Sequence, residues 1–419
     1  MAEVPIVLIL VGLAAYTVLG GADFGAGFWE LTARGERGAA LRDHTHRSMA
    51  PVWEANHVWL VFVLTMAWTC YPQAFASIAS TLTIPLFVAA VGIILRGAGY
   101  ALRAGSSTPR EEGAISLLFA LSSVLTPFAL GLVVGGIASG RVPIGNAEGD
   151  EITSWLNGTS LLIGTLAVAT AAYIAAVYLA ADARRMGAEE IAGAFRARAL
   201  AAGVVAGALA IAGPFVLSSD APEVYDGLTG GAGVVALLAS AAAGSTALAL
   251  VATRRYSAAR VAAATAVAAI VAGWGLAQEP YLLLPDLTIE QAAAGDATIV
   301  AVLIGFAVGL LILAPSLGYL FRLVLSGRFD PATAPWPGPP AAAVAAANAD
   351  PDAHGSPRAA PIAGAVTALG AGVTFFSDAP LRSLGIAVML IGAIACFLAV
   401  AALDEADTPA LPFPPRDGD

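Results

Sequence analysis

Charged side chains are scarce in this chain, and lysine is missing altogether. Of the 419 residues, 12% are charged and 58% are hydrophobic, whereas soluble domains carry roughly 25% charged residues. So small a charged fraction leaves too little polar surface to cover a water-soluble globule of this size. The composition therefore excludes a soluble protein and predicts that lipid is the solvent for much of the surface.

Cysteine is rare as well. Cys70 and Cys396 both fall inside apolar runs, where we interpret them as small buried side chains. There is no CxxC pair and no Cys/His cluster with metal-ligand spacing, so the sequence predicts no metal centre. The net charge of −10 argues against a nucleic-acid partner. We also expect no cleavable signal peptide, because the first apolar run is too long and no basic segment precedes it.

Long apolar runs, in contrast, are abundant. They are continuous, which disfavours a β-barrel, and most are close to the 20 residues that a helix needs to cross a bilayer. We therefore predict an all-α, polytopic transmembrane bundle. The eleven candidate spans are residues 4–31, 51–71, 74–101, 113–138, 155–181, 197–217, 230–252, 258–277, 297–325, 361–377 and 384–403.

Arginines fall on alternate loops and give the bundle a direction, because short cytoplasmic loops carry the excess of positive charge. Arg141 and Arg382 are mild exceptions. The pattern predicts an outside N-terminus and a multi-pass protein of the bacterial cytoplasmic membrane. The loops after spans one, three, five, seven and nine carry Arg34, Arg37, Arg42, Arg47, Arg103, Arg110, Arg184, Arg185, Arg196, Arg198, Arg254, Arg255, Arg260, Arg322 and Arg328.

The ninth span is followed by a different kind of sequence. Residues 329–360 are rich in Pro and Ala without periodicity, and we interpret them as a flexible cytoplasmic linker. The predicted organisation is a nine-helix core (1–328), this linker, an appended transmembrane hairpin (361–403) and an acidic tail (404–419).

Three ionisable residues interrupt the spans: Asp23, Glu54 and Arg96. Each costs about 2.5–3.5 kcal/mol on insertion scales, so such residues usually mark a partner or a pathway. The topology places all three at a similar depth near the cytoplasmic face. One hypothesis is an ion pair that only holds helices together. The other is a proton route, in which the acid that Arg96 does not pair is left to titrate. Which acid pairs with Arg96 stays open.

The second span opens with further polar and aromatic residues. Pro51 suits the first turn of a helix, and Asn56 needs a hydrogen-bond partner inside the span. Trp53 and Trp59 fit either interfacial anchors or a functional role. Because haem in a bundle usually needs His or Met ligands from two helices, and only His57 lies near a span, we expect no haem ligand on this chain. We expect the remaining histidines to be solvated: His44, His46 and His354.

Two segments resemble subunit II of cytochrome bd-type quinol oxidases. Residues 21–27 (GADFGAG) match the first motif, and residues 49–60 (MAPVWEANHVWL) match a longer and more specific one. Residues 96–99 (RGAG) look like the family's third-helix arginine segment, and residues 280–288 like its loop before the ninth helix. The resemblance covers about residues 4–328. Glu54 stands where many members have Asp, which keeps the carboxylate but lengthens its reach.

The resemblance implies a partner, a reaction and roles for residues. A haem-bearing subunit I would hold b-type and d-type haem and oxidise quinol, and oxygen would be reduced to water. By position, Glu54 would lie in the proton path, Asp23 would be the first-helix acid that assists it or pairs with Arg96, and Trp59 would be associated with oxygen access. Trp53 and Asn56 are candidates for contacts with quinone or the haem region.

Alternatives remain for the whole chain and for its hairpin. A secondary transporter also fits glycine-rich helices with charges near the midplane. A scaffold subunit without a proton role is a third reading. The appended hairpin has three possible roles: contact with subunit I, replacement of a small accessory subunit, or tethering. Lipid surrounds the chain in every case.

Overall fold

The computed structural model describes residues 1–33, 35–103 and 109–325. Helices form almost all of this part, so the predicted all-α bundle is confirmed, with one short antiparallel hairpin as an exception. The elements are α1 (Glu3–Thr32), α2 (Gly35–Cys70), α3 (Pro72–Thr81), α4 (Thr83–Arg103), α5 (Pro109–Ala138), α6 (Gly158–Arg185), α7 (Glu189–Asp220), α8 (Pro222–Thr229), α9 (Gly231–Ala252), α10 (Tyr256–Gln278), β1 (Tyr281–Leu283), β2 (Leu287–Thr288), α11 (Ile289–Ala292) and α12 (Asp296–Leu325).

Within the described residues, seven helices are long and apolar enough to cross a membrane, or eight if the bent pair α2–α3 is one span. The apolar part of α4, Thr83–Gly99, is shorter. Each of the nine spans predicted between residues 4 and 325 contains one long helix. The chain is therefore a multi-pass membrane protein, whereas a count of nine spans stays a prediction. The predicted linker, hairpin and tail lie outside the described residues.

The second predicted span differs from the structure at its start. We expected a cytoplasmic loop before residue 51, but α2 begins at Gly35, so Pro51 falls inside the helix and not in its first turn. The early turns pack on the bundle, since Leu41 is buried and a ring nitrogen of His44 donates to the Leu179 carbonyl at 3.0 Å. The prediction of a solvated His44 is therefore wrong. Hydropathy detects only the part of a helix that meets lipid, which is why this polar extension was missed.

The third predicted span, 74–101, is not one helix. It divides at Leu82 into α3 and α4, and α3 leaves the axis of α2 through a bend of 118°. Apolar side chains on α3 pack inward beside Cys70 and Tyr71, so an average over hydropathy merges this short helix with the true span. Pro72 in the first turn of α3 lacks an N–H and so marks the new start.

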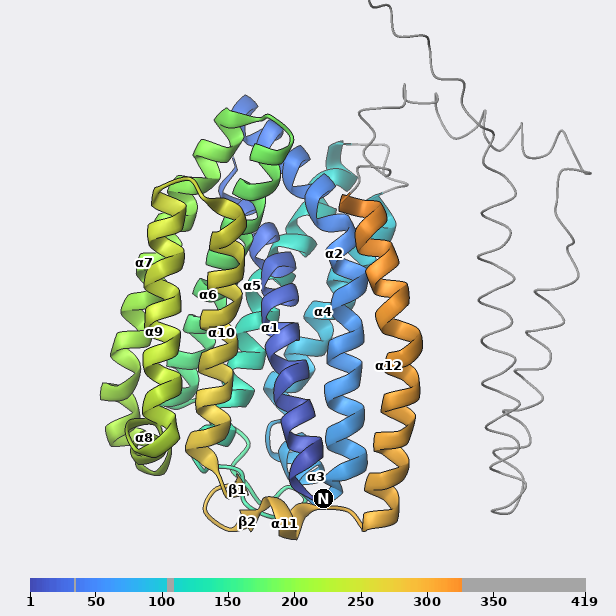
Figure 1. Ribbon diagram of the computed structural model, residues 1–419, viewed down its shortest axis with the longest axis vertical. Coiled ribbons are helices and arrows are strands. Elements are labelled where there is room, and N and C mark those ends of the chain that lie inside the picture. Colours follow the sequence, from blue (N-terminus) through green and yellow to red (C-terminus); the bar gives the residue numbers. More distant parts are fainter. Residues whose placement is uncertain (34, 104–108, 326–419) are drawn as a thin grey trace, which may run out of the picture. The chain divides into compact units, whose positions relative to one another are not determined.

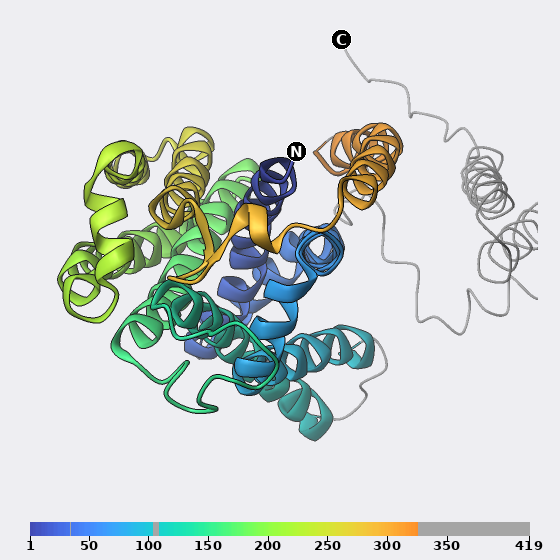
Figure 2. The same cartoon turned by 90° about the horizontal axis from the view of Figure 1, so that it is seen from below.

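Helix α1 occupies the centre of the bundle and packs against α2, α5, α6 and α10 (Figures 1 and 2). Two of its faces carry glycines at close contacts. Gly25 lies against the main chain of α6 at Ala171 and Ala172, while Gly20 faces α2 and Gly27 faces α5. Small residues let membrane helices approach closely and gain van der Waals contact where no hydrophobic drive is available. The alanine-rich middle of α6 forms the largest buried cluster with α1, α7, α9 and α10.

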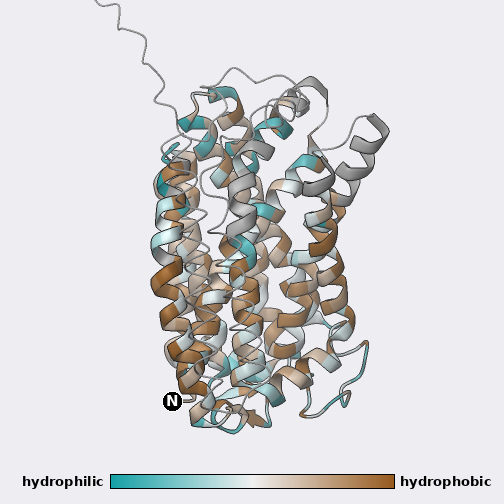
Figure 3. Cartoon of the chain, turned by 90° about the vertical axis from the view of Figure 1, so that its right-hand side faces the viewer, coloured by the Kyte–Doolittle hydropathy of each residue, from teal (hydrophilic) through white to brown (hydrophobic). Residues whose placement is uncertain are grey.

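The two ends of the bundle carry opposite charges. Figure 1 places the N-terminus, α3, the β1–β2 hairpin and α11 at one end, here called the cap end. The loops of the cap end are acidic, and the opposite, basic end carries the arginines of α6, α7 and the α9–α10 loop. Figure 3 shows apolar residues along the helices and hydrophilic ones toward both ends. The charge alternation of the sequence thus corresponds to a segregation by end among the described residues.

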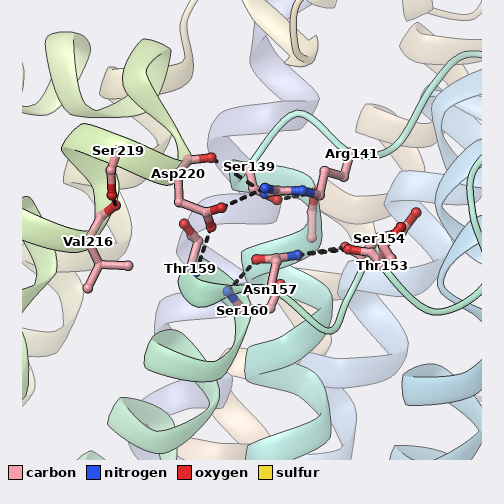
Figure 4. A network of polar contacts seen from close by, with 11 residues as sticks. Ser139, Arg141, Thr153, Ser154, Asn157, Thr159, Ser160, Val216, Ser219 and Asp220 are labelled. Atoms are coloured by element: carbon pink, nitrogen blue, oxygen red, sulfur yellow. Dashed lines mark hydrogen bonds and ion pairs between the residues drawn. The ribbon is translucent and has the colours of Figure 1, made fainter.

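Arg141, the exception to that alternation, is neutralised at the cap end. Its Nη2 donates to Asp220 Oδ1 at 2.5 Å, and the other oxygen of Asp220 accepts from the Thr159 backbone N–H at 2.8 Å (Figure 4). Asn157 beside them caps α6 by accepting from the Ser160 N–H at 2.9 Å. The network links the ends of α5 and α7 to the start of α6, so this arginine serves packing and does not contradict the orientation pattern.

The contact between α1 and α6 leads to a first prediction. Gly25→Ala should destabilise the purified protein by about 1–3 kcal/mol, because the new Cβ would overlap the Ala171 carbonyl. The matched control is Gly207→Ala on α7, where nothing lies within 4 Å of the new Cβ; it should be neutral or stabilising by up to about 1 kcal/mol. Thermal unfolding in detergent measures both. Equal unfolding midpoints for the two variants would contradict the close packing of α1 on α6.

Candidate functional site

Asp23 lies on α1, inside the bundle and without exposure to solvent. The glycines around it bring the neighbouring helices close: Gly20 and Gly27, one turn away on either side, face α2 and α5. A carboxylate in such a place must be paired or hydrogen-bonded, because an isolated buried charge is very costly.

Arg96 on α4 is the partner of that carboxylate. Its Nε donates to Asp23 Oδ2 at 2.7 Å, and its Nη2 donates to Oδ1 at 2.6 Å and to the Asp23 carbonyl at 2.5 Å. The pair is bidentate, and Arg96 is 1% exposed. The sequence left open which acid meets Arg96, and the structure shows Asp23 in that position.

Three residues that the sequence analysis did not name complete the surroundings of Arg96. Its Nη1 donates to Ser123 Oγ on α5 at 2.9 Å, and that hydroxyl donates to the Phe119 carbonyl at 2.7 Å. The guanidinium carbon lies 4.1 Å from the ring centroid of Phe119 and 4.8 Å from that of Phe24, distances at which cation–π attraction is effective. Ser123 could have been predicted from the sequence only as a polar residue inside an apolar span.

The Asp23–Arg96 pair connects helices α1 and α4 and fixes how they align. Removing water from two charges costs several kcal/mol per ion, and only good geometry with further hydrogen bonds repays it. Here every nitrogen of the guanidinium has an acceptor. The link ties α1, α4 and α5 in one register through charge-assisted hydrogen bonds.

Asn56 on α2 lies next to this pair and is 1% exposed. Its amide packs on Gly20, so that a Cβ at Gly20 would lie 2.9 Å from Asn56 Oδ1. We expected a hydrogen-bond partner for Asn56, yet its Oδ1 is buried without one. Tyr16, one turn before Gly20, is also buried and lies within electrostatic reach of Asp23 and Arg96.

Glu54 and Trp53 belong to α2, but their side chains lie outside the described residues. The backbone still gives the depth of Glu54. It precedes Asn56 by two residues, or about 3 Å of helix rise, and Asp23 follows Gly20 by three residues, or about 4.5 Å. Because α1 and α2 run in opposite directions, both acids are at nearly the same level of the bundle.

Trp59 is not part of this cluster. It is half-buried and meets Phe62 edge to face at a centroid distance of 6.4 Å, and Phe62 in turn lies 4.9 Å from Phe306 of α12. Trp59 therefore belongs to an aromatic contact between α2 and α12. Its assignment to oxygen access remains a prediction.

Two of the four histidines, His44 and His57, have side chains in the described part of the chain. His44 uses a ring nitrogen on the Leu179 carbonyl, and Met66 is buried in an apolar cluster with Cys70 and Tyr71. Among the described residues, no three His, Cys, Asp or Glu side chains converge in a metal-binding group. The His354 position and the His46 side chain lie outside the described residues.

Comparison with known proteins gives a consistent result. Residues 1–324 match the family described as "Cytochrome bd terminal oxidase subunit II". The chain is 23% identical over 335 residues to the "Putative cytochrome bd menaquinol oxidase subunit II" of Bacillus subtilis (strain 168), covering 75% of this chain and 92% of that protein. A solved chain in "The structure of bd oxidase from Geobacillus thermodenitrificans" is 27% identical with a TM-score of 0.65, covering 77% of this chain and 98% of that one.

These matches agree with the motifs around Asp23 and Glu54 and with the helical fold. They do not favour a secondary transporter. Oxidases of this family are complexes that carry haem and contain a subunit I. The chain belongs to the cytochrome bd terminal oxidase subunit II family, and it is a membrane subunit of a respiratory oxidoreductase complex.

Proposed function

We propose that this subunit delivers protons from the cytoplasm to a haem-bearing subunit I, with Glu54 as the relay and the Asp23–Arg96 pair as a fixed charge beside it. The observation that carries the proposal is the bidentate pair: both oxygens of Asp23 accept from Arg96. With both carboxylate oxygens engaged by one guanidinium, Asp23 serves as a fixed member of an ion pair. Glu54, at the same level on α2, is the better candidate for the titrating group.

The electron chemistry belongs to the partner in this proposal. We keep the expectation that haem ligands come from the partner, and two contacts support it: His44 is bound to a main-chain carbonyl, and Met66 is packed among apolar side chains. We assign b-type and d-type haem and the quinol-oxidising site to subunit I, with oxygen as electron acceptor. The Bacillus relative is named for menaquinol, which makes a quinol the proposed donor. Trp53 and Trp59 would contact the haem region, quinone or oxygen path, whereas Asn56 is buried against Gly20 of α1 and is not assigned to such a contact.

The proposed direction of uptake requires the basic end of the bundle to face the cytoplasm. The segregation of arginines to that end supports this orientation. Proton uptake there and release on the other side would build the membrane potential. Asp23 and Glu54 both lie nearer the basic end, because α1 starts at the cap end and reaches Asp23 late in its course.

Replacement of Glu54 tests the relay. In the assembled oxidase, Glu54→Gln should lower quinol-supported oxygen consumption about tenfold or more, because an amide cannot pass a proton as a carboxylic acid does. Glu54→Asp, which keeps the carboxylate, is the matched control and should retain most of the activity. The optical spectrum checks that haem content is near normal. A wild-type rate in Glu54→Gln would overturn the relay, and loss of haem would make the residue structural.

Replacement of Arg96 tests the fixed charge. Arg96→Leu leaves Asp23 buried without its partner, and we expect a loss of about 3–5 kcal/mol and poor accumulation of the complex. The double variant Asp23→Leu/Arg96→Leu should recover much of that loss, because it removes both charges. Thermal unfolding of the purified complex measures the effect. Normal stability in Arg96→Leu, or slow turnover of Asp23→Asn in a fully stable complex, would instead favour Asp23 as the relay.

Orientation can be measured with single cysteines in a background that lacks Cys396. A membrane-impermeant maleimide should label Asn146→Cys at the cap end in intact spheroplasts. Ser257→Cys, exposed at the start of α10 at the basic end, should react only after the membrane is opened. Each variant is the control for the other. The opposite labelling pattern would reverse the proposed direction of proton uptake.

A further inference from the structure

Ten buried side-chain atoms in the described part of the chain have no hydrogen-bond partner, and two of them lie about one helical turn along the bundle from the ion pair. These two are Asn56 Oδ1 on α2 and Thr126 Oγ1 on α5, and their residues are 1% and 0% exposed. Buried polar groups in proteins are almost always satisfied, by protein or by ordered water. Two unsatisfied oxygens at a similar distance along the bundle from one charged pair therefore need an explanation.

Thr126, like Thr81 and Thr159, has a buried hydroxyl without a hydrogen-bond partner, and in this it differs from four other threonines of the long helices. In the membrane helices, the hydroxyls of Thr17, Thr165, Thr246 and Thr265 each donate to the carbonyl four residues earlier. Thr126 has a carbonyl at the same spacing but does not use it. Its Oγ1 is directed at Gly92 of α4. The side chain is thus turned away from its own helix and toward the interior.

The two oxygens are displaced from the ion pair in the same direction along the bundle. Asn56 Oδ1 faces Gly20, which precedes Asp23 by about 4.5 Å along α1, and Thr126 Oγ1 faces Gly92, which precedes Arg96 by about 6 Å along α4. Helices α1 and α4 both run from the cap end toward the basic end. Both oxygens therefore lie on the deep side of the pair, toward the membrane interior, and so does Tyr16.

Side-chain packing without internal water does not explain why polar residues occupy positions 56 and 126. A valine at position 126 would fill the same space without an unsatisfied hydroxyl, and an apolar side chain would suit Gly20 better than an amide. Both positions instead present an acceptor about one helical turn along the bundle from a fixed charge. Internal water commonly satisfies such groups when a site is polar, and water next to a relay carboxylate can carry protons onward.

We propose that Asn56 and Thr126 hold internal water on the deep side of the Asp23–Arg96 pair, and that this water continues the proton path from the level of Glu54 toward the membrane interior. Both are positioning residues, acting through the water that they orient. The inference rests on the proposed proton delivery. It adds Thr126 as a new residue, a specific role for Asn56 and a direction for the path.

The test uses the assembled oxidase with Thr126→Val and Asn56→Leu, which keep the size of each side chain but remove its hydrogen bonding. We expect oxygen consumption to fall about tenfold, with a larger solvent deuterium isotope effect and normal haem content. Thr126→Ser keeps the hydroxyl and should recover the rate. The matched control is Thr165→Val, whose hydroxyl is satisfied by the Leu161 carbonyl on an exposed face of α6; it should be unaffected.

Water itself is probed by radiolytic hydroxyl-radical labelling, which marks side chains next to bound water without requiring turnover. Tyr16 should be labelled in the wild-type complex, and less so in Thr126→Val and Asn56→Leu. A wild-type rate in a Thr126→Val complex that is at least as thermostable would show that the region is dry and overturn the inference. A slow Thr126→Ser with an unchanged isotope effect would overturn it too, since it would indicate a packing role.

The outcomes separate this inference from the proposed function. If Glu54→Gln is slow while Thr126→Val and Asn56→Leu turn over normally, the relay stands and the water path is refuted. If Glu54→Gln is normal but Tyr16 labelling depends on Asn56 and Thr126, the water stands and the relay is refuted.

Discussion

The buried Asp23–Arg96 pair is the interaction on which the rest of the site depends. Two charges without solvent are tolerable only if each finds the other in good geometry, and the geometry here demands that α1 and α4 keep one register. Ser123 extends that demand to α5, and the rings of Phe24 and Phe119 close over the guanidinium. Position and chemistry are therefore coupled, because the atoms that hold the helices together are also the fixed charges beside the proposed proton relay.

Glycine makes this coupling possible. Helix α1 meets α6 on one face and α2 and α5 on another, and on both faces a side chain would collide with the neighbour. Close approach brings Asp23 within reach of an arginine on a different helix. It also brings the Asn56 amide against Gly20, where the polar group meets main chain in place of a side chain. A helix with larger residues would hold the same charges too far apart to pair.

Asp23 and Arg96 could be predicted from the sequence because charged residues are rare inside membrane spans. An Asp and an Arg within apolar runs predict each other, and alternating arginines gave the spans their order. Ser123 and Thr126 were not found, since small hydroxyls are common in membrane helices and their importance depends on where they point. The start of α2 and the break at Leu82 failed for a related reason: hydropathy reports contact with lipid, whereas helix ends depend on packing against protein.

The Arg141–Asp220 link also bears on how the chain enters the membrane. Asp220 follows Arg141 by 79 residues, so the arginine leaves the ribosome well before its partner exists. On the proposed orientation, that positive charge must cross the bilayer before Asp220, at the end of α7, is available to pair with it. The more numerous arginines of the basic end would have to outweigh it during synthesis. During insertion Arg141 thus disfavours the proposed orientation, because it is a positive charge in a translocated loop. Once insertion is complete, the same residue links α5 to α7 through its ion pair with Asp220.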